Sequence, residues 1–398
     1  MDDGRARAAV PWLLGLALVA NVYLLPGSAG SPRLTDALGL VLALWLVRRL
    51  AGRGVPGPPL AALAVLAAPV AVWTVLAATS GRSATMLLGA RWLLAVPWGL
   101  ALAEVTATPD SRRRLAWGLW WGLAANVVVL VVQNFGLLDL TARLGLAARD
   151  SVLSDLDQFS RYPGMHGHAN ASGAVVSLLA PVSLYLYFAA GARLWTPIVG
   201  ILLLLAGGHV TSSRSPLIIA ALVTLACGAF SRRPVSTLRI GAALGAVVLP
   251  LLLWLGPPGG QVRWEDQGNV AVNSGERLAS NRIGLALVAE TPLGRGVEAS
   301  AEALTDALDN PSMHNAFLQL AAVFGLPVAG WVAWALLRNS AGLWGGPGSA
   351  RWLTAALALQ TFGLFFFEEH GNNPTFIALT AWLVAAAAPH SAGQEGCA

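Results

Sequence analysis

The chain contains no lysine, and charged residues of any kind are scarce. All 25 basic residues are arginine, and Asp, Glu and Arg together make up 11% of the 398 residues. Soluble globular domains average about 25% charged residues, so a soluble fold is excluded. Two cysteines, Cys227 and Cys397, are too few for a disulfide framework or a cysteine-based metal site.

What the sequence has instead is a high apolar content, 56% with a mean hydropathy of +0.63. Apolar runs that could cross about 30 Å of hydrocarbon as helices recur from end to end. The first run resembles a signal peptide that could be cleaved after Ala29, but its length favours a retained helix. We therefore predict an all-α polytopic membrane protein, one domain over residues 1–398, with about 12 transmembrane helices. The predicted spans are 8–26, 35–50, 58–79, 84–104, 115–137, 169–190, 195–212, 215–230, 238–256, 315–337, 352–367 and 375–389.

Arginine placement predicts the orientation of these spans. With an even number of spans, both termini lie on one side, and the loops on that side carry 14 of the 25 arginines. The short opposite loops carry only Arg33, Arg82 and Arg214. Because cytoplasmic loops are enriched in basic residues, both termini are predicted to be cytoplasmic. Two long segments, 138–168 and 257–314, are then extracytoplasmic, and the second is predicted to form short amphipathic helices over 275–290 and 298–308.

A histidine stands at the border between the second long segment and the next apolar run, in "NPSMHNAFLQL" at 310–320. Pro311 suits the first turn of a helix that Asn310 or Ser312 could cap. The positive N-terminal end of such a helix attracts anions and disfavours imidazolium, so His314 would be neutral, as a general base requires. The alternative is an interfacial histidine that only bonds lipid headgroups or a loop carbonyl.

Arginines on the same predicted side favour the first interpretation. Arg214 lies at the tip of the short hairpin "TSSRS", Arg282 lies on the predicted amphipathic helix, and Arg161 begins the Gly-rich "RYPGMHGHANASG". Guanidinium groups bind diphosphate through paired hydrogen bonds. Arginines that bind a diphosphate, together with a neutral histidine that acts as a base, are the residues that displacement of a diphosphate leaving group requires. The predicted supporting residues are Asn315, Asn281, Asn170 and His168.

Four stretches occur in an order and spacing that resemble the O-antigen ligase/polymerase superfamily. They are "RYPGMHGHANASGAVVSLLAP", "TSSRSPLIIAALVTL", "NRIGLALVAETPLGRG" and "MHNAFLQLAAVFGLPVAGWV". The resemblance covers residues 150–340, and the first four spans match only as hydrophobic helices. The chain departs from it after Arg282, where many members have an aromatic residue.

The resemblance implies a GT-C-like fold in the bacterial inner membrane with an extracytoplasmic active site. It implies a metal-independent glycosyltransferase, without cofactor, that moves a glycan from a polyprenyl (undecaprenyl) diphosphate carrier to an acceptor hydroxyl with inversion. By resemblance, His314 is the base, Arg214 and Arg282 hold the diphosphate, and Arg161 matches a further family arginine. The expected partners are the lipid-linked glycan donor, a glycan or glycolipid acceptor and the lipid bilayer, with no nucleic acid.

Some alternatives stay open at the level of sequence. A repeat-unit polymerase differs from a ligase only in its acceptor, and a transporter or flippase would need ionisable residues at membrane depth, for which Arg91 is the one candidate. Arg91 either snorkels to the interface or faces an internal cavity. Asp155 and Asp157 have a D-x-D spacing that could bind a metal, although an ordinary acidic loop is the more frequent explanation. The sequence "EEH" at 368–370 offers an alternative base.

Overall fold

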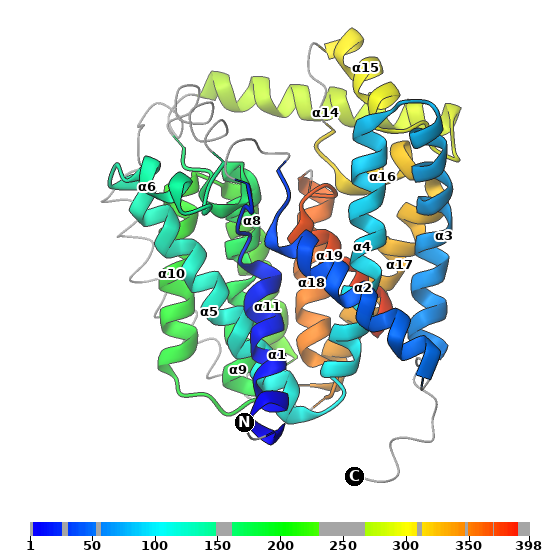
Figure 1. Cartoon of the computed structure of the whole chain (residues 1–398). Coiled ribbons are helices and arrows are strands. Elements are labelled where there is room, and N and C mark those ends of the chain that lie inside the picture. Colours follow the sequence, from blue (N-terminus) through cyan, green and yellow to red (C-terminus); the bar gives the residue numbers. More distant parts are fainter. Residues whose placement is uncertain are drawn as a thin grey trace.

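The protein is described by a computed structural model over residues 3–25, 31–52, 57–148, 161–230, 267–308, 313–346, 349–368 and 370–388. Regular structure in these residues is helical, apart from one antiparallel bridge between Tyr23 and Arg33 (Figure 1). The α-helices are α1 (Asp3–Val19), α2 (Leu34–Gly52), α3 (Gly57–Thr79), α4 (Ser83–Val105), α5 (Pro109–Asn134), α6 (Leu138–Arg143), α8 (Ala169–Ser177), α9 (Leu179–Phe188), α10 (Trp195–Thr211), α11 (Arg214–Ala229), α14 (Gln267–Glu290), α15 (Val297–Leu308), α16 (Ala316–Phe324), α17 (Leu326–Ser340), α18 (Trp352–Phe367) and α19 (Pro374–Ala386).

Membrane-crossing length confirms the predicted class of protein. In the described part of the chain, four helical segments are long and apolar enough to cross a membrane, namely α3, α4, α5 and the continuous stretch Ala169–Phe188. Shorter apolar helices accompany them, including α10, α18 and α19. The predicted span 238–256 lies outside the described residues. The total of 12 spans and the GT-C-like arrangement therefore stay predictions.

Close packing of small residues fixes the direction of the first helix. A Cβ added at Gly15 would meet the Leu115 carbonyl oxygen, and one added at Gly122 would meet the Val19 side chain, so the contacts advance along both helices in the same direction. Helices α1 and α5 therefore run parallel with their backbones in contact, as small residues allow in membrane proteins. The start of α1 and the arginine-rich start of α5 consequently lie at the same end of the bundle.

Helices α14 and α15 lie at the other end, where α14 crosses the bundle (Figure 1). The predicted helices 275–290 and 298–308 are confirmed, although α14 begins earlier, at Gln267. We call this end of the bundle the α14 end. Which side of the membrane it faces stays a prediction.

Two predicted spans were wrong in their limits. The span 8–26 ends as a helix at Val19, because the following segment is held by other contacts: the Asn21 side chain donates to the Met165 carbonyl at 2.8 Å, and Tyr23 pairs with Arg33. Arg33 lies in the connection between α1 and α2, as predicted, but it is only 6% exposed and its guanidinium lies over the Tyr23 ring.

The predicted span 315–337 is two helices, α16 and α17, because the chain turns at Gly325. This residue has φ +100°, which favours glycine, and its backbone packs against that of Leu293. A Cβ at Gly325 would lie 2.8 Å from the Leu293 carbonyl oxygen. The helix break therefore lets the segment between α14 and α15 approach the start of α17.

Candidate functional site at the α14 end

The hairpin between α10 and α11 carries the first predicted site arginine. Helix α10 ends at Thr211, Ser212 adopts a left-handed conformation (φ 51°), and α11 begins at Arg214. The prediction of a very short hairpin with Arg214 at its tip is confirmed. Because α11 starts there, Arg214 lies at the positive end of a helix dipole.

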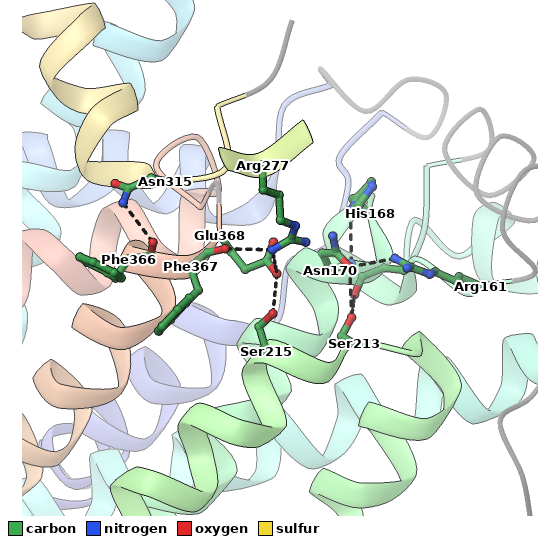
Figure 2. Close-up of polar contacts among 11 residues, drawn as sticks. Arg161, His168, Asn170, Ser213, Ser215, Arg277, Asn315, Phe366, Phe367 and Glu368 are labelled. Atoms are coloured by element: carbon green, nitrogen blue, oxygen red, sulfur yellow. Dashed lines mark hydrogen bonds and ion pairs between the residues drawn. The ribbon is translucent and has the colours of Figure 1, made fainter. Parts of the chain in front are cut away.

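The residues on either side of Arg214 are tied to two different clusters (Figure 2). Ser213 Oγ donates to Asn170 Oδ1 at 3.3 Å, and Ser215 Oγ donates to Glu368 Oε1 at 2.9 Å. Helix α11 is thus fixed at its first turn to the start of α8 on one side and to the end of α18 on the other. Arg214 is the residue between these two attachments.

The first cluster contains three predicted residues. Arg161 Nη1 donates to Asn170 Oδ1 at 2.9 Å, so this oxygen accepts from both Arg161 and Ser213. His168 Nδ1 accepts from the Asn170 backbone amide at 3.2 Å and caps α8. The structure therefore brings Arg161, His168 and Asn170 together beside the α10–α11 hairpin.

The second cluster is an ion pair that the prediction did not contain (Figure 2). Arg277 Nη1 of α14 lies 3.2 Å from Glu368 Oε1 and also donates to the Phe367 carbonyl at 3.2 Å. The Glu368 side chain is 6% exposed and that of Arg277 is 36% exposed. The contact attaches the middle of the segment 257–314 to the end of α18, next to the start of α11.

Arg282, the predicted partner on α14, lies five residues after Arg277. Five residues rotate an α-helix by about 140°, so the two side chains leave α14 in different directions. Arg282 is exposed and makes no hydrogen bond or ion pair with the part of the chain that the structure describes. Asn281, which is partly buried, lies four residues after Arg277 and on its face. The sequence alone could not show that Arg277, and not Arg282, faces Glu368, because no local pattern links α14 to α18.

His314 stands immediately before α16. The cap of this helix is Asn315, whose Oδ1 accepts from the Leu318 amide at 3.0 Å, so the predicted caps were wrong; Asn310 and Ser312 lie outside the described residues. Asn315 Nδ2 also donates to the Phe366 carbonyl at 3.0 Å. This bond holds the start of α16, and with it His314, beside the end of α18.

Burial and neighbouring charge set the protonation of His314. Burial is the main cause that lowers its pKa, the Arg277 guanidinium lowers it further, and the carboxylates of Glu368 and Glu276 oppose the shift. The net pKa lies below the ordinary value, so the imidazole is neutral at neutral pH. The histidine is also close enough to Arg277 and Glu368 for their charges to act on it.

The remaining candidates are the alternative base His370, the membrane-depth arginine Arg91 and three acidic residues. His370 is 2% exposed and stacks on Phe376, and burial lowers its pKa to about 4. A bulky acceptor therefore has no direct access to His370. The Arg91 side chain is 12% exposed, lies 3.7 Å from Asp36 and lines a cavity, which favours the cavity-facing alternative. Asp155, Asp157 and Glu369 lie outside the described residues.

Comparison with protein families decides the family. Residues 199–335, from within α10 to within α17, match the family model described as O-Antigen ligase. Over these residues the chain matches the O-antigen ligase/polymerase superfamily. None of the curated proteins matches the chain.

The superfamily match places three predicted residues, Arg214, Arg282 and His314, inside one family domain. Arg161 and its cluster precede the matched segment, although the structure joins them to it through Ser213. The family match and the apolar helices together support a multi-pass bacterial membrane protein of the O-antigen ligase/polymerase type.

Proposed function

We propose that this superfamily member transfers a glycan from a polyprenyl diphosphate carrier to an acceptor hydroxyl at the extracytoplasmic face of the membrane. The observation that carries the proposal is the position of His314. A histidine with a lowered pKa stands beside Arg277 and Glu368, and Glu368 is bonded to the first turn of the helix that Arg214 begins. A neutral base and a cationic anion site are thus close together at one end of the bundle.

The chemistry assigned to these residues is a single displacement. His314 takes the proton from the acceptor hydroxyl, whose oxygen forms a bond to the anomeric carbon of the donor sugar. The bond from that carbon to the diphosphate oxygen breaks, and its electron pair leaves with the polyprenyl diphosphate. Attack opposite to the leaving group inverts the anomeric configuration. His314 then releases its proton to water.

Arginine is proposed to neutralise the charge that develops on the leaving diphosphate. Arg214 combines a guanidinium with the positive end of α11, and Arg282 is an exposed guanidinium on α14. Arg161 is proposed to assist from the neighbouring cluster. In this scheme arginines replace the divalent cation that many other transferases use, so the reaction is metal-independent.

Glu368 is assigned a positioning role and not that of the base. Its carboxylate accepts hydrogen bonds from Ser215 and Arg277, so it is occupied by partners in both α11 and α14. It holds the segment 257–314 against the bundle next to His314. The acceptor distinguishes a ligase, which uses a surface glycan or glycolipid, from a polymerase, which uses a second lipid-linked repeat.

The test is glycan transfer in liposomes by purified protein with an undecaprenyl-diphosphate-linked glycan. We expect His314→Ala to bind the donor normally and to lose about 10²–10⁴-fold in rate, the usual contribution of a general base. His209→Ala, which removes a histidine near the start of the matched segment, is the control. Near-normal transfer by His314→Ala would remove His314 from the mechanism. Supplying a surface glycan or a second lipid-linked repeat as acceptor separates ligase from polymerase.

A further inference from the structure

Helices α5 and α10 pack side by side, and a group of tryptophan rings joins them near the start of each helix (Figure 1). Trp120 of α5 is buried at the centre of the group, where its Nε1 donates to Ser183 Oγ at 3.0 Å. The ring centroids of Trp121 and Trp195 lie 5.0 and 6.1 Å from that of Trp120. Trp121 is 50% exposed and Trp195 is 44% exposed. The buried ring therefore holds two half-exposed rings at the surface of the bundle.

Two exposed arginines accompany these rings at the end of the bundle where α5 begins. Arg113 precedes Trp117 by four residues and so shares its face of α5. Arg193 precedes Trp195 by two residues, in the connection from α9 to α10. Because the ring centroids of Trp117 and Trp195 are 6.3 Å apart, both arginines belong to one surface. We call this surface the Trp–Arg face and define it by Arg113, Trp117, Trp121, Arg193 and Trp195.

The described part of the chain does not compensate the two positive charges of the Trp–Arg face. The side chains of Arg113 and Arg193 form no ion pair or hydrogen bond with the residues that the structure describes. Of the acidic residues nearby, Glu104 at the end of α4 is paired with Arg49 at 2.7 Å. Asp110, in the first turn of α5, forms no ion pair with Arg113 three residues later. Both guanidinium groups are therefore available to an external anion.

Apolar residues continue from the Trp–Arg face towards the middle of the bundle. Helix α5 is long and apolar enough to cross a membrane, and Val128 lies on it seven residues after Trp121 and is exposed. On α10, Ile198 and Leu202 follow Trp195 at helical spacing and are also exposed. From the end inwards, the order is guanidinium, indole and aliphatic side chain. A phospholipid presents its phosphate, its ester groups and its acyl chains in the same order.

We propose that the Trp–Arg face binds an anionic phospholipid, with the phosphate at Arg113 and Arg193 and an acyl chain along Val128 and Leu202. Guanidinium groups match the geometry of phosphate oxygens, and indole rings favour the level of the headgroups. A small soluble anion would leave the tryptophans and the aliphatic residues without a partner. With the predicted orientation, this lipid belongs to the cytoplasmic leaflet, whose anionic lipids attract basic residues next to a span. The proposal is independent of the transfer chemistry, which is assigned to the opposite end of the bundle.

The test measures lipid binding to the purified full-length protein in neutral detergent by native mass spectrometry. The probes are the anionic dioleoyl phosphatidylglycerol and the zwitterionic dioleoyl phosphatidylcholine. The variant Arg113→Gln/Arg193→Gln removes both charges of the Trp–Arg face. The matched control removes two exposed arginines at the same end of the bundle, Arg48 near the end of α2 and Arg351 before α18, again by substitution with Gln.

Each basic residue near an anionic membrane surface contributes a factor of about five in affinity. We therefore expect the wild type and the control to bind phosphatidylglycerol at least about tenfold more tightly than phosphatidylcholine. Arg113→Gln/Arg193→Gln should lose at least about tenfold in affinity for phosphatidylglycerol, with that for phosphatidylcholine unchanged. Trp121→Ser, at a half-exposed position, should weaken the binding of both lipids, because the indole contacts the ester and acyl groups that they share.

Equal affinities of the wild type for the two lipids would overturn the anionic preference. Equal losses in Arg113→Gln/Arg193→Gln and in the control would overturn the site, because they would show a general attraction of this end of the bundle for anions. Displacement of phosphatidylglycerol by an equal concentration of inorganic phosphate would identify a soluble anion as the ligand and would overturn the lipid assignment. Unchanged binding of both lipids by Trp121→Ser would remove the tryptophans from the site.

Discussion

The contact between Arg277 and Glu368 should be strongly asymmetric, because its two partners differ in burial. Changing Arg277 to Met keeps most of the aliphatic stem but leaves the Glu368 carboxylate, only 6% exposed, with Ser215 as its remaining side-chain donor among the residues that the structure describes. An unsatisfied buried polar group costs about 1–3 kcal/mol, and more when it is charged. Changing Glu368 to Gln leaves a guanidinium that is 36% exposed and that water can solvate. Exposed pairs contribute at most about 1 kcal/mol.

We therefore expect Arg277→Met to lower the free energy of unfolding about two to three times as much as Glu368→Gln. The measurement is denaturant unfolding of the detergent-purified protein, followed by tryptophan fluorescence. Arg282→Met, on the same helix at an exposed position, is the control and should change stability by less than about 0.5 kcal/mol. A cost of Glu368→Gln equal to or above that of Arg277→Met would refute the burial argument.

The same two variants should shift the pH dependence of transfer in opposite directions. Transfer needs neutral His314, so activity falls as the pH drops through the pKa of this histidine. Arg277 lowers that pKa and Glu368 raises it. The acidic limb should thus move to higher pH in Arg277→Met and to lower pH in Glu368→Gln. Shifts of the same sign would show that neither charge acts on the base.

Four further outcomes are expected. Arg214→Lys and Arg282→Lys should each lose at least about tenfold in donor affinity, because an ammonium cannot form the paired hydrogen bonds of a guanidinium; equal affinity would leave only general positive charge. Gly118→Ala should lower the free energy of unfolding by about 1–3 kcal/mol, since its Cβ would meet the Trp12 carbonyl, whereas Gly330→Ala, in open space, should not. The Glu298 carboxylate accepts from the Ala84 amide and from Thr85, and although burial raises its pKa these hydrogen bonds outweigh that effect and lower it. The stabilisation of α15 should therefore be present above the ordinary pKa of glutamate and be lost as the pH falls through the lowered pKa of Glu298. Hydrogen exchange of the α15 amides measures this pH dependence, and Glu298→Gln should abolish it. A cysteine at Ser274 should be labelled from the extracytoplasmic side, and labelling from inside alone would reverse the orientation.

Hydropathy and short-range spacing in the sequence were enough to predict the helices, one hairpin and the superfamily. Runs of apolar residues predicted the helices because a helix satisfies its own backbone hydrogen bonds, which a membrane demands of every crossing segment. The short hairpin at Arg214 and the helices over 275–290 and 298–308 followed from similarly local signals. The order of four motifs indicated the superfamily that residues 199–335 then confirmed.

Only the tertiary structure decided which polar side chains meet. Arg277 and Glu368 are 91 residues apart, and no local pattern couples them. Arg33 was predicted in a short loop and lies in one, but hydropathy could not reveal that the Tyr23 ring covers its guanidinium and buries it. The break at Gly325 likewise depends on the approach of Leu293 from another segment. Local sequence specifies where helices form. Contacts between distant helices specify which charged side chains are paired, and these contacts bring the residues of the candidate site together.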